Sequence, residues 1–397
     1  MNGSEIEYEP RSVKDLVADM KDTSELMVDL AYSAVLYENR ELAKEVLDLE
    51  ERMNVLRYHA HIALTLAARN PDGAEKLVGI FQIVGAAEKI ANAADDIATV
   101  LTQDVGLPDE FRSALPEAKE VVFRAQVDEE SELGGHTLGD LDLETNTGVH
   151  VFAIRRDTEW IFAPDRDSQV VRGDVLFGEG PETGVERVYG RATRRDWERE
   201  GAVSSEIENL DRAVTAVVEM KNISELAVGL AYSAVLLESH EVATEVRALE
   251  TKTDRLRQNL EEWVLESAAR VDDPTKLRGL MHLAIASEVI ADAALEVADS
   301  VMRDINAHPV FAEAIRESNE VIATVSVDEG TELDGRTLGE LLVESETGMY
   351  VMAIHRKDDE WVYSPTEHTT VCAGDTLIAR GPDGGKERLR RMAHDVA

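Results

Sequence analysis

The feature that most constrains this chain is an identical repeat of seven residues. The sequence LAYSAVL occupies residues 30–36 and recurs at residues 230–236. The segments around both copies also recur, in the same order and at the same spacing. A repeat of this length and distance indicates a structural unit that has been duplicated. The chain is therefore expected to consist of two similar halves, residues 1–200 and 201–397.

The aligned parts of the two halves differ in length by one inserted residue. Arg156 and Trp160 correspond to Arg356 and Trp361, so the second copy is one residue longer between these positions. Extra length is best tolerated at the tip of a hairpin, where the chain is exposed. The insertion therefore predicts a hairpin turn at this point in both copies.

The chain is strongly acidic. Asp and Glu number 80 against 41 Lys and Arg, and the formal net charge is −39. Proteins that bind free nucleic acid need Lys and Arg to neutralise its phosphates, so direct nucleic-acid binding is not expected. Only 11 of the basic residues are Lys. An acidic, Lys-poor surface is typical of proteins that work in high salt, and we expect a halophilic source, with an ordinary acidic cytosolic protein as the alternative.

Neither a signal peptide nor a membrane-spanning segment is expected. The first ten residues carry three Glu and no apolar run, and no window of about twenty residues is free of charge. These features predict a cytoplasmic protein without membrane insertion. The single cysteine, Cys372, excludes an intramolecular disulfide, and its strand-like apolar neighbours predict a buried, inert thiol.

Apolar residues spaced by three and four predict three helices at the start of each half. In the third helix, a face containing Phe81, Ala87 and Ala91 would let neighbouring helices approach closely. Short connections between long helices predict an up-down-up bundle. The expected helices are residues 13–37, 42–68 and, after a break at 70–73, a third helix; then 210–239, 242–269 and 274–306.

The second part of each half predicts a small α+β domain of about 65 residues. The expected strands are residues 121–127, 149–155, 160–162 and 175–179, and then 321–327, 349–355, 361–363 and 376–380. The first strand of each set precedes a loop and a short helical turn led by Thr-Leu-Gly. The glycine-rich segments at 178–181 and 381–385 are interpreted as turns, and the Arg-rich segment 187–199 as a solvated connector.

The predicted fold class is therefore α+β, with two three-helix bundles, each followed by a small α+β domain. The expected boundaries are 10–118 and 119–190 for the first bundle and domain, 191–209 for a linker, and 210–318 and 319–392 for the second bundle and domain.

Two pairs of carboxylates in the second bundle are candidates for metal binding. Glu250 and Asp254 lie four residues apart on one expected helix, and Glu288 and Asp292 do so on the next. Residues four apart share one helix face, so each pair places two like charges side by side. Adjacent antiparallel helices carrying both pairs could offer four oxygen ligands to a hard divalent cation.

Two observations weigh against this hypothesis. The corresponding pairs in the first half, Glu50 with Asn54 and Glu88 with Asn92, lack the second carboxylate. In a chain with 80 acidic residues, pairs at this spacing also arise by chance. Spacing alone therefore leaves a solvated acidic helix face as the alternative.

A family resemblance supports the metal hypothesis. The segments AEKIANAA at residues 87–94 and SEVIADAA at residues 287–294 resemble the third-helix signature of PhoU-type three-helix repeats. That family carries a Glu/Asp-x-x-x-Asp motif on two helices, and the motif binds metal clusters in some members. The resemblance therefore implies a metal site on the second bundle and puts metal binding by the first bundle in doubt. The matching residues are Glu250, Asp254, Glu288 and Asp292.

The small domains resemble the TrkA C-terminal (RCK_C-like) domain. The resemblance is carried by residues 326–341, 348–355 and 373–381, and more weakly by 131–141 and 173–176. Such domains accompany potassium channels and transporters, dimerise, and in some members bind a cyclic di-nucleotide, notably cyclic di-AMP. The order of the two domain types, repeated in tandem, is similar to that of haloarchaeal-type PhoU/TrkA-C proteins and covers nearly the whole chain.

Four residues of the second small domain are candidates for ligand binding. His355, Arg356 and Arg380 offer one imidazole and two guanidinium groups near strand ends, where they could face phosphates, and Ile354 precedes them. The first copy has Glu179 in place of Arg380. The alternative is that these are ordinary charges at strand edges.

No enzyme signature is present, because the sequence shows neither a phosphate-cradling glycine loop nor a nucleophile with its base. The resemblances imply a non-enzymatic cytoplasmic regulator of a potassium channel or transporter, peripheral to the membrane through that partner. A PhoU-like negative regulator of phosphate uptake and signalling is the alternative, and a metal-dependent phosphohydrolase is a third hypothesis. The two small domains are expected to form an intramolecular pseudo-dimer, and a homodimer of whole chains is left open.

Overall fold

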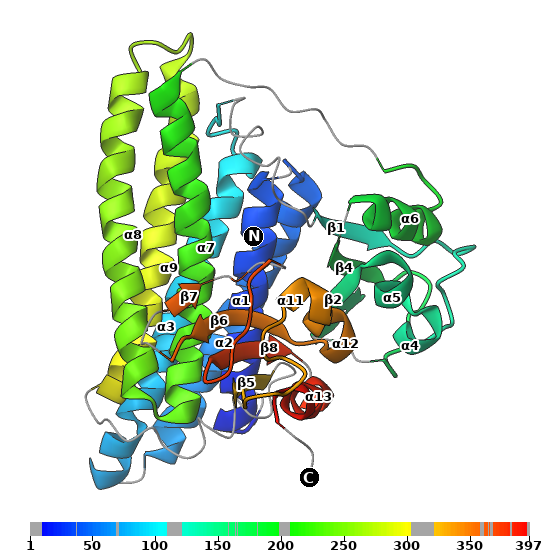
Figure 1. The fold of residues 1–397 in the computed structure, drawn as a ribbon. Helices are drawn as coiled ribbons and strands as arrows, with labels where there is room; N and C mark the ends of the chain where they lie inside the picture. The colour runs from blue at the N-terminus through cyan, green and yellow to red at the C-terminus, as the bar shows by residue number, and fades with distance from the viewer. Residues whose placement is uncertain are drawn as a thin grey trace. The chain divides into compact units, whose positions relative to one another are not determined.

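The computed structural model describes residues 10–108, 121–197, 207–302 and 321–394, apart from residues 37, 69, 70, 158, 163, 165, 181, 358–360, 364, 366, 367 and 382. The chain forms two compact units. One contains residues 1–116 and 202–318, and the other contains residues 117–201 and 319–397. The helical segments of both halves thus belong to one unit, and the strand-containing segments belong to the other (Figure 1).

The first unit contains the two predicted three-helix bundles. Bundle 1 consists of α1 (Val13–Leu36), α2 (Arg40–Ala67) and α3 (Pro71–Thr102). Bundle 2 consists of α7 (Glu208–Leu237), α8 (His240–Ser267) and α9 (Arg278–Met302), the last preceded by a 3₁₀ turn, η2 (Pro274–Leu277). The α1–α2 and α7–α8 turns are set by capping, because the side chains of Asn39 and Ser239 accept hydrogen bonds from the first-turn amides of α2 and α8.

The two bundles pack against each other mainly through α3 and α9. The small-residue face predicted for the third helix lies in this core, where Ala87, Ala91, Ala291 and Ala294 are at most 2% exposed. Small side chains allow the close approach of helices. Phe81 was placed on the same face and is an exception, since it is 37% exposed.

A pair of equivalent tyrosines marks the contact between the bundles. The Tyr32 hydroxyl of α1 lies 3.1 Å from Ser224 Oγ of α7 and 2.7 Å from Ser287 Oγ of α9. Burial raises the pKa of Tyr32 to about 12, although both serines lower it in part. These bonds connect the two halves of the duplicated unit.

The equivalent contact is incomplete on the other side. The Tyr232 hydroxyl is buried, and among the described residues it has no partner with hydrogen-bonding geometry. Burial raises the pKa of Tyr232, an effect that nearby Ser24 offsets only in part. The position equivalent to Ser287 is Ala87, which carries no hydroxyl. The duplicated interface is therefore not symmetric.

One segment of bundle 1 is apolar enough to resemble a membrane span. Residues Leu77–Thr102 have the length and mean hydropathy of a spanning helix, but 61% of the most apolar window is buried inside the protein. A core helix of a globular protein has the same properties. This one segment is weak evidence for a membrane span.

The second unit contains two small domains with the same sheet topology. In the first, β1 (Val121–Gln126), β2 (His150–Arg156), β3 (Glu159–Phe162) and β4 (Val175–Gly180) form an antiparallel sheet in the order β1-β4-β2-β3. In the second, β5 (Val321–Ser326), β6 (Tyr350–His355), β7 (Trp361–Tyr363) and β8 (Thr376–Gly381) repeat this order. The predicted hairpin is confirmed, because β2 pairs with β3 and β6 with β7 on either side of the inserted residue.

Short helices connect the strands and close each domain. The predicted Thr-Leu-Gly turn forms α4 (Leu138–Leu141) and α11 (Leu338–Leu341), each with a capping box made by the preceding threonine. Next follow α5 (Leu143–Thr147) and α12 (Val343–Thr347). The final helices are α6 (Glu182–Thr193) and α13 (Asp383–Ala393).

The final helices correct the sequence interpretation. Residues 381–385 were expected to form a turn, and residues 187–199 a connector, but α13 begins at Asp383 and α6 continues to Thr193. The glycines there permit close packing, because a Cβ on Gly385 would lie 2.3 Å from the Thr347 carbonyl oxygen. Because α7 begins at Glu208, helices extend into both ends of the linker expected at residues 191–209.

The thiol prediction is also wrong. Cys372 lies in the loop before β8 and is exposed. Its neighbour Val371 fills the core instead. The apolar segment before β8 therefore does not by itself show which of its side chains face the core.

Candidate functional site

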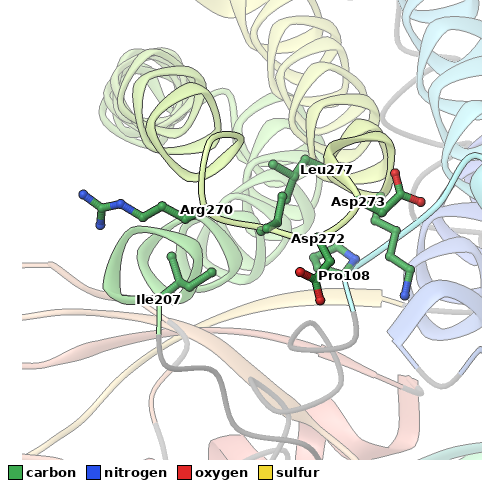
Figure 2. Close-up of a pocket in the computed structure, with 8 residues that line it drawn as sticks. Pro108, Ile207, Arg270, Asp272, Asp273 and Leu277 are labelled. Atoms are coloured by element: carbon green, nitrogen blue, oxygen red, sulfur yellow. The ribbon is translucent and has the colours of Figure 1, made fainter.

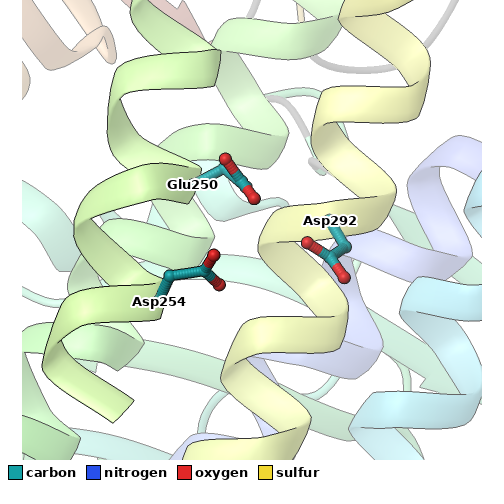
Figure 3. Close-up of side chains that lie close together, drawn as sticks. All are labelled: Glu250, Asp254 and Asp292. Carbon is teal, nitrogen blue, oxygen red and sulfur yellow. The ribbon is translucent and has the colours of Figure 1, made fainter. Parts of the chain in front are cut away.

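Three carboxylates from two helices of bundle 2 converge in the structure. Glu250 and Asp254 project from α8, and Asp292 projects from the adjacent α9 (Figure 3). Each offers one carboxylate oxygen, and these oxygens lie within 4.8 Å of one another. The four-residue spacing on α8 and the antiparallel packing of α9 together create this arrangement.

The fourth predicted ligand is engaged elsewhere. Glu288 Oε2 lies 2.7 Å from the Nε of Arg257, and Arg257 also pairs with Glu261. The structure thus brings together three of the four candidates and places Glu288 in an ion pair. Arg257 was missed at the sequence level, although it lies three residues after Asp254 and therefore on the same helix face.

Charge repulsion shapes the electrostatics of this cluster. Burial raises the pKa of Glu250, and the Asp254 carboxylate raises it further. Burial also raises the pKa of Asp292, again with Asp254 as the next cause. Groups whose pKa is raised by folding stabilise the fold below their unfolded pKa, and this contribution is lost as the pH rises through the raised value. Ionised at neutral pH, the cluster is therefore destabilising unless a cation or proton neutralises it.

The donor set fits a hard divalent cation. Carboxylate oxygens are the ligands preferred by Mg²⁺, Mn²⁺ and Ca²⁺, and water can complete the coordination. Glu250 and Asp254 are half-buried, whereas Asp292 is exposed, so the cluster is open to solvent on one side. Glu250, Asp254 and Asp292 would hold the ion. Metal binding here stays a prediction.

At the same position in bundle 1, the carboxylates of Glu50 and Glu88 accept hydrogen bonds from neighbouring side chains. Asn54 Nδ2 donates to Glu50 Oε1 at 2.5 Å, and the guanidinium of Arg57 donates to Glu88 Oε1 at 2.5 Å. Arg57 also donates to Asn54 Oδ1 at 3.3 Å. The amide at position 54 supplies the neutralising donor that bundle 2 lacks at Asp254. This local network is the difference between the two bundles at this position, and the location of any metal site in the second half stays a prediction.

A metal titration tests the cluster. We expect Mn²⁺ or Mg²⁺ to raise the unfolding temperature of the protein, and to do so more at pH 8 than at pH 5, because protons compete for carboxylates with raised pKa values. Metal at about 100 times its dissociation constant would add roughly 2.7 kcal/mol. Asp254→Asn, which installs the residue found at position 54, should abolish the shift. Thermal unfolding with metal analysis of the purified protein measures both effects.

A matched variant controls for general acidity. Glu241→Gln removes an exposed carboxylate from the first turn of the same helix, four residues before Glu245. It should leave the metal-induced shift unchanged. An equal loss in both variants would show that the cation acts through overall charge and not through the cluster.

The candidate ligand residues of the second small domain do not form one cluster within that domain. Ile354 is fully buried. His355 stacks on Trp361 with ring centroids 4.6 Å apart, and Arg380 lies over the ring of Tyr350 at 5.7 Å. The sheet register pairs His355 with Thr376 and Tyr350 with Arg380, so His355 and Arg380 are separated by about 16 Å along the strands.

Arg356 and its equivalent in the first copy, Arg156, each form an ion pair with a buried aspartate. Arg356 pairs with Asp375, which is 2% exposed, and it donates to the Thr370 carbonyl oxygen at 2.9 Å. In the first copy, Arg156 forms two bonds of 2.9 Å to the two oxygens of Asp174. Neither aspartate is among the residues predicted from the sequence. The aspartate follows the arginine by 18 residues in the first copy and by 19 in the second, and the difference is the one inserted residue. This matching position in the repeat is the signal that could have identified both aspartates.

A shallow depression lies at the end of bundle 2. It has a volume of about 250 Å³ and is formed by the loop after α8, the η2 turn and two residues from other segments (Figure 2). Arg270 and Lys276 bring positive charge, but Asp272 and Asp273 bring an equal negative charge. Asp273 caps η2 by accepting from the Thr275 amide at 3.0 Å. The lining therefore shows no preference for a charged ligand.

Comparison with known families identifies four domains. Residues 17–101 and 217–301 match the PhoU domain, and residues 122–191 and 322–394 match the TrkA-C domain. The matches alternate along the chain in the order that the repeat predicts. A comparison with curated proteins gives no significant match.

Solved structures give weaker likenesses. The chain is similar to the "GsuK channel bound to NAD" at 10% identity and a TM-score of 0.19, covering 70% of this chain and 53% of that one. The "GsuK RCK domain" matches at 11% identity and 0.19, covering 72% and 65%. The "human SLO3 gating ring" matches at 10% identity and 0.28, covering 82% and 79%. The chain thus spans only about half to two-thirds of the GsuK proteins, and the TM-scores do not establish a shared overall fold.

Proposed function

Because the chain belongs to the PhoU and TrkA-C domain families and carries the pair twice in tandem, we propose that it is a cytoplasmic, non-enzymatic regulator of ion transport. The most specific form of this proposal is control of a potassium channel or transporter. The TrkA-C domains would bind a ligand, and the PhoU bundles would transmit the change or contact the transporter. The protein would then associate with the membrane only through that partner.

The tandem pairing of two regulatory domain types is the observation that carries this proposal. Both domain types are regulatory, and together they account for most of the chain. A ligand can shift such a protein between states only if it binds one state more tightly. Duplication within one chain supplies the two copies that a paired TrkA-C arrangement requires, and we propose that they form an intramolecular pseudo-dimer.

Ligand binding is tested by thermal unfolding. We expect cyclic di-AMP, at saturating concentration, to raise the unfolding temperature by a few degrees, because a ligand that binds only the folded state stabilises it. His355→Ala and Arg380→Ala should each reduce the shift. Arg356→Ala is unsuitable, since Arg356 pairs with the buried Asp375. Arg336→Ala, at an exposed residue paired with Glu332, is the control. A flat response to cyclic di-AMP and other nucleotides would contradict ligand sensing.

The carboxylate cluster favours a second candidate, a PhoU-like negative regulator of phosphate uptake and signalling. Affinity capture from cells grown under potassium or phosphate limitation separates the two. Capture of a potassium transporter supports the main proposal, and capture of a phosphate transporter or its sensor kinase supports the second. A metal-dependent phosphohydrolase remains a third candidate, which release of inorganic phosphate from a phosphomonoester by the Mn²⁺-loaded protein would reveal.

A further inference from the structure

One surface of bundle 1 differs from the acidic character of the whole chain. Residues 52–68, which are the second half of α2 and its C-cap residue Ala68, contain no Asp or Glu, although the chain carries 80. The equivalent residues of bundle 2, 252–268, contain four acidic residues. The second half of α2 is thus an acid-free segment in a chain with a net charge of −39.

The same segment exposes a stripe of apolar side chains. Val55, Tyr58 and Leu66 are 37%, 40% and 65% exposed, and Ile62 is partly exposed. Their spacing of three, four and four residues places them on one face of α2. We call these four residues the α2 stripe.

Packing within the bundle does not require the α2 stripe to be apolar. The equivalent positions on α8 are Arg255, Gln258, Glu262 and Glu266. Both helices bury several of the same inward positions, including Leu49 with Leu249 and Leu64 with Val264. The fold therefore does not determine which residues occupy the outward face of α2. An exposed apolar patch at such a face indicates a surface that another molecule contacts.

The α2 stripe is complementary to itself. If two copies of α2 cross in antiparallel orientation about a point between residues 60 and 61, Val55 faces Leu66 of the partner subunit. Tyr58 then lies within one residue step, about 1.5 Å along the axis, of the level of Ile62 of the partner subunit. Such a two-fold contact extends over about 16 Å of helix and needs no second kind of surface.

Charge also favours this face for self-association. Two copies that each carry a formal charge of −39 repel, and the repulsion is smallest where acidic side chains are absent. We propose that the α2 stripe is the contact surface of a homodimer, in which α2 packs against α2 of a second copy in antiparallel orientation. Because salt screens the repulsion between copies, the dimer should become tighter as ionic strength rises.

Sedimentation velocity over a range of protein and salt concentrations tests the surface. The wild-type chain should dimerise, and more strongly at high salt. Val55→Arg and Leu66→Glu install residues found at the equivalent positions of α8, so each should fold, and each should weaken the dimer about tenfold or more. Leu265→Glu alters a side chain that is 75% exposed on bundle 2, outside the stripe, and should have no effect.

Two results would overturn the proposal. One is a wild-type chain that stays monomeric at every salt concentration, which would assign the stripe to another partner. The other is a dimer that survives Leu66→Glu but is lost with Leu265→Glu.

Disulfide cross-linking tests the orientation. In a Cys372→Ser background, a chain carrying Val55→Cys should cross-link to one carrying Leu66→Cys more readily than either does to itself. Preferential self-cross-linking would contradict the antiparallel arrangement.

Discussion

Replacing Asp174 by alanine is expected to destabilise the first small domain by about 2–4 kcal/mol. The carboxylate is 1% exposed, accepts both bonds from Arg156 and also accepts from the Val171 amide at 2.7 Å. Its removal leaves the Val171 amide without its acceptor and leaves the Arg156 guanidinium with the Gln169 carbonyl oxygen, at 2.8 Å, but without the opposite charge. The estimate lies below that for a fully buried pair because the Arg156 side chain is 39% exposed and remains partly solvated.

Hydrogen exchange measures this effect within a multidomain chain. Amides of β2 and β4 should exchange roughly 30- to 700-fold faster, since each 1.4 kcal/mol is a factor of ten. Amides of β6 and β8 in the second domain should not change and serve as an internal reference. Glu186→Ala, at an exposed site on α6, is the matched control, with an expected change within about 0.5 kcal/mol. Unchanged exchange in the Asp174 variant would mean that the ion pair contributes little to stability.

The second large effect distinguishes two residues that occupy the same place in the repeat. Tyr32→Phe should destabilise the helical unit by about 1–1.5 kcal/mol, because it removes two hydrogen bonds between the bundles. Three hydroxyl hydrogens serve these two contacts and the two contacts of Ser224 and Ser287 with backbone carbonyl oxygens, at 2.9 and 2.7 Å. Without the Tyr32 hydroxyl both serines can donate to those carbonyls, which limits the loss. Tyr232→Phe should instead be neutral or stabilising by up to about 1 kcal/mol, because the buried hydroxyl that it removes makes no hydrogen bond of good geometry and interacts only in part with Ser24.

Thermal unfolding of the two variants checks this prediction directly. Each variant is the control for the other, because both lose the same hydroxyl at equivalent positions of the repeat. Ala87→Ser should supply the missing hydroxyl beside Tyr232. In that background, Tyr232→Phe should become destabilising. Equal destabilisation by Tyr32→Phe and Tyr232→Phe would show that the bundle interface is symmetric in solution.

The candidate metal site was predictable in its outline because it depends on local geometry. The four-residue spacing of Glu250 and Asp254 places both on one helix face, whatever surrounds the helix. The engagement of Glu288 was not predictable in the same way. It depends on the separation of α8 and α9 and on where the long side chain of Arg257 ends, and helix periodicity determines neither.

The candidate ligand residues show the same limit. Sequence placed His355 and Arg380 near strand ends, but only the register of β6 with β8 shows that they lie at opposite ends of the strand pair. The final helices α6 and α13 were missed for a related reason. Glycine and proline near their starts predict turns, whereas the structure uses Gly184 and Gly385 to bring each helix against the carbonyl oxygen of Thr147 or Thr347.

Sequence alone predicts the duplication, the long helices, the strands, the two domain types and the loss of carboxylates at Asn54 and Asn92. These properties follow from periodicity and from residue identity, which are local. The three-dimensional packing was needed to show that the Tyr32 hydroxyl makes hydrogen bonds that the Tyr232 hydroxyl lacks. It was also needed to show that Arg356 pairs with Asp375 and that α2 presents an exposed apolar stripe. Those properties depend on which side chains meet across distant segments, and two copies of one sequence pattern can therefore differ in them.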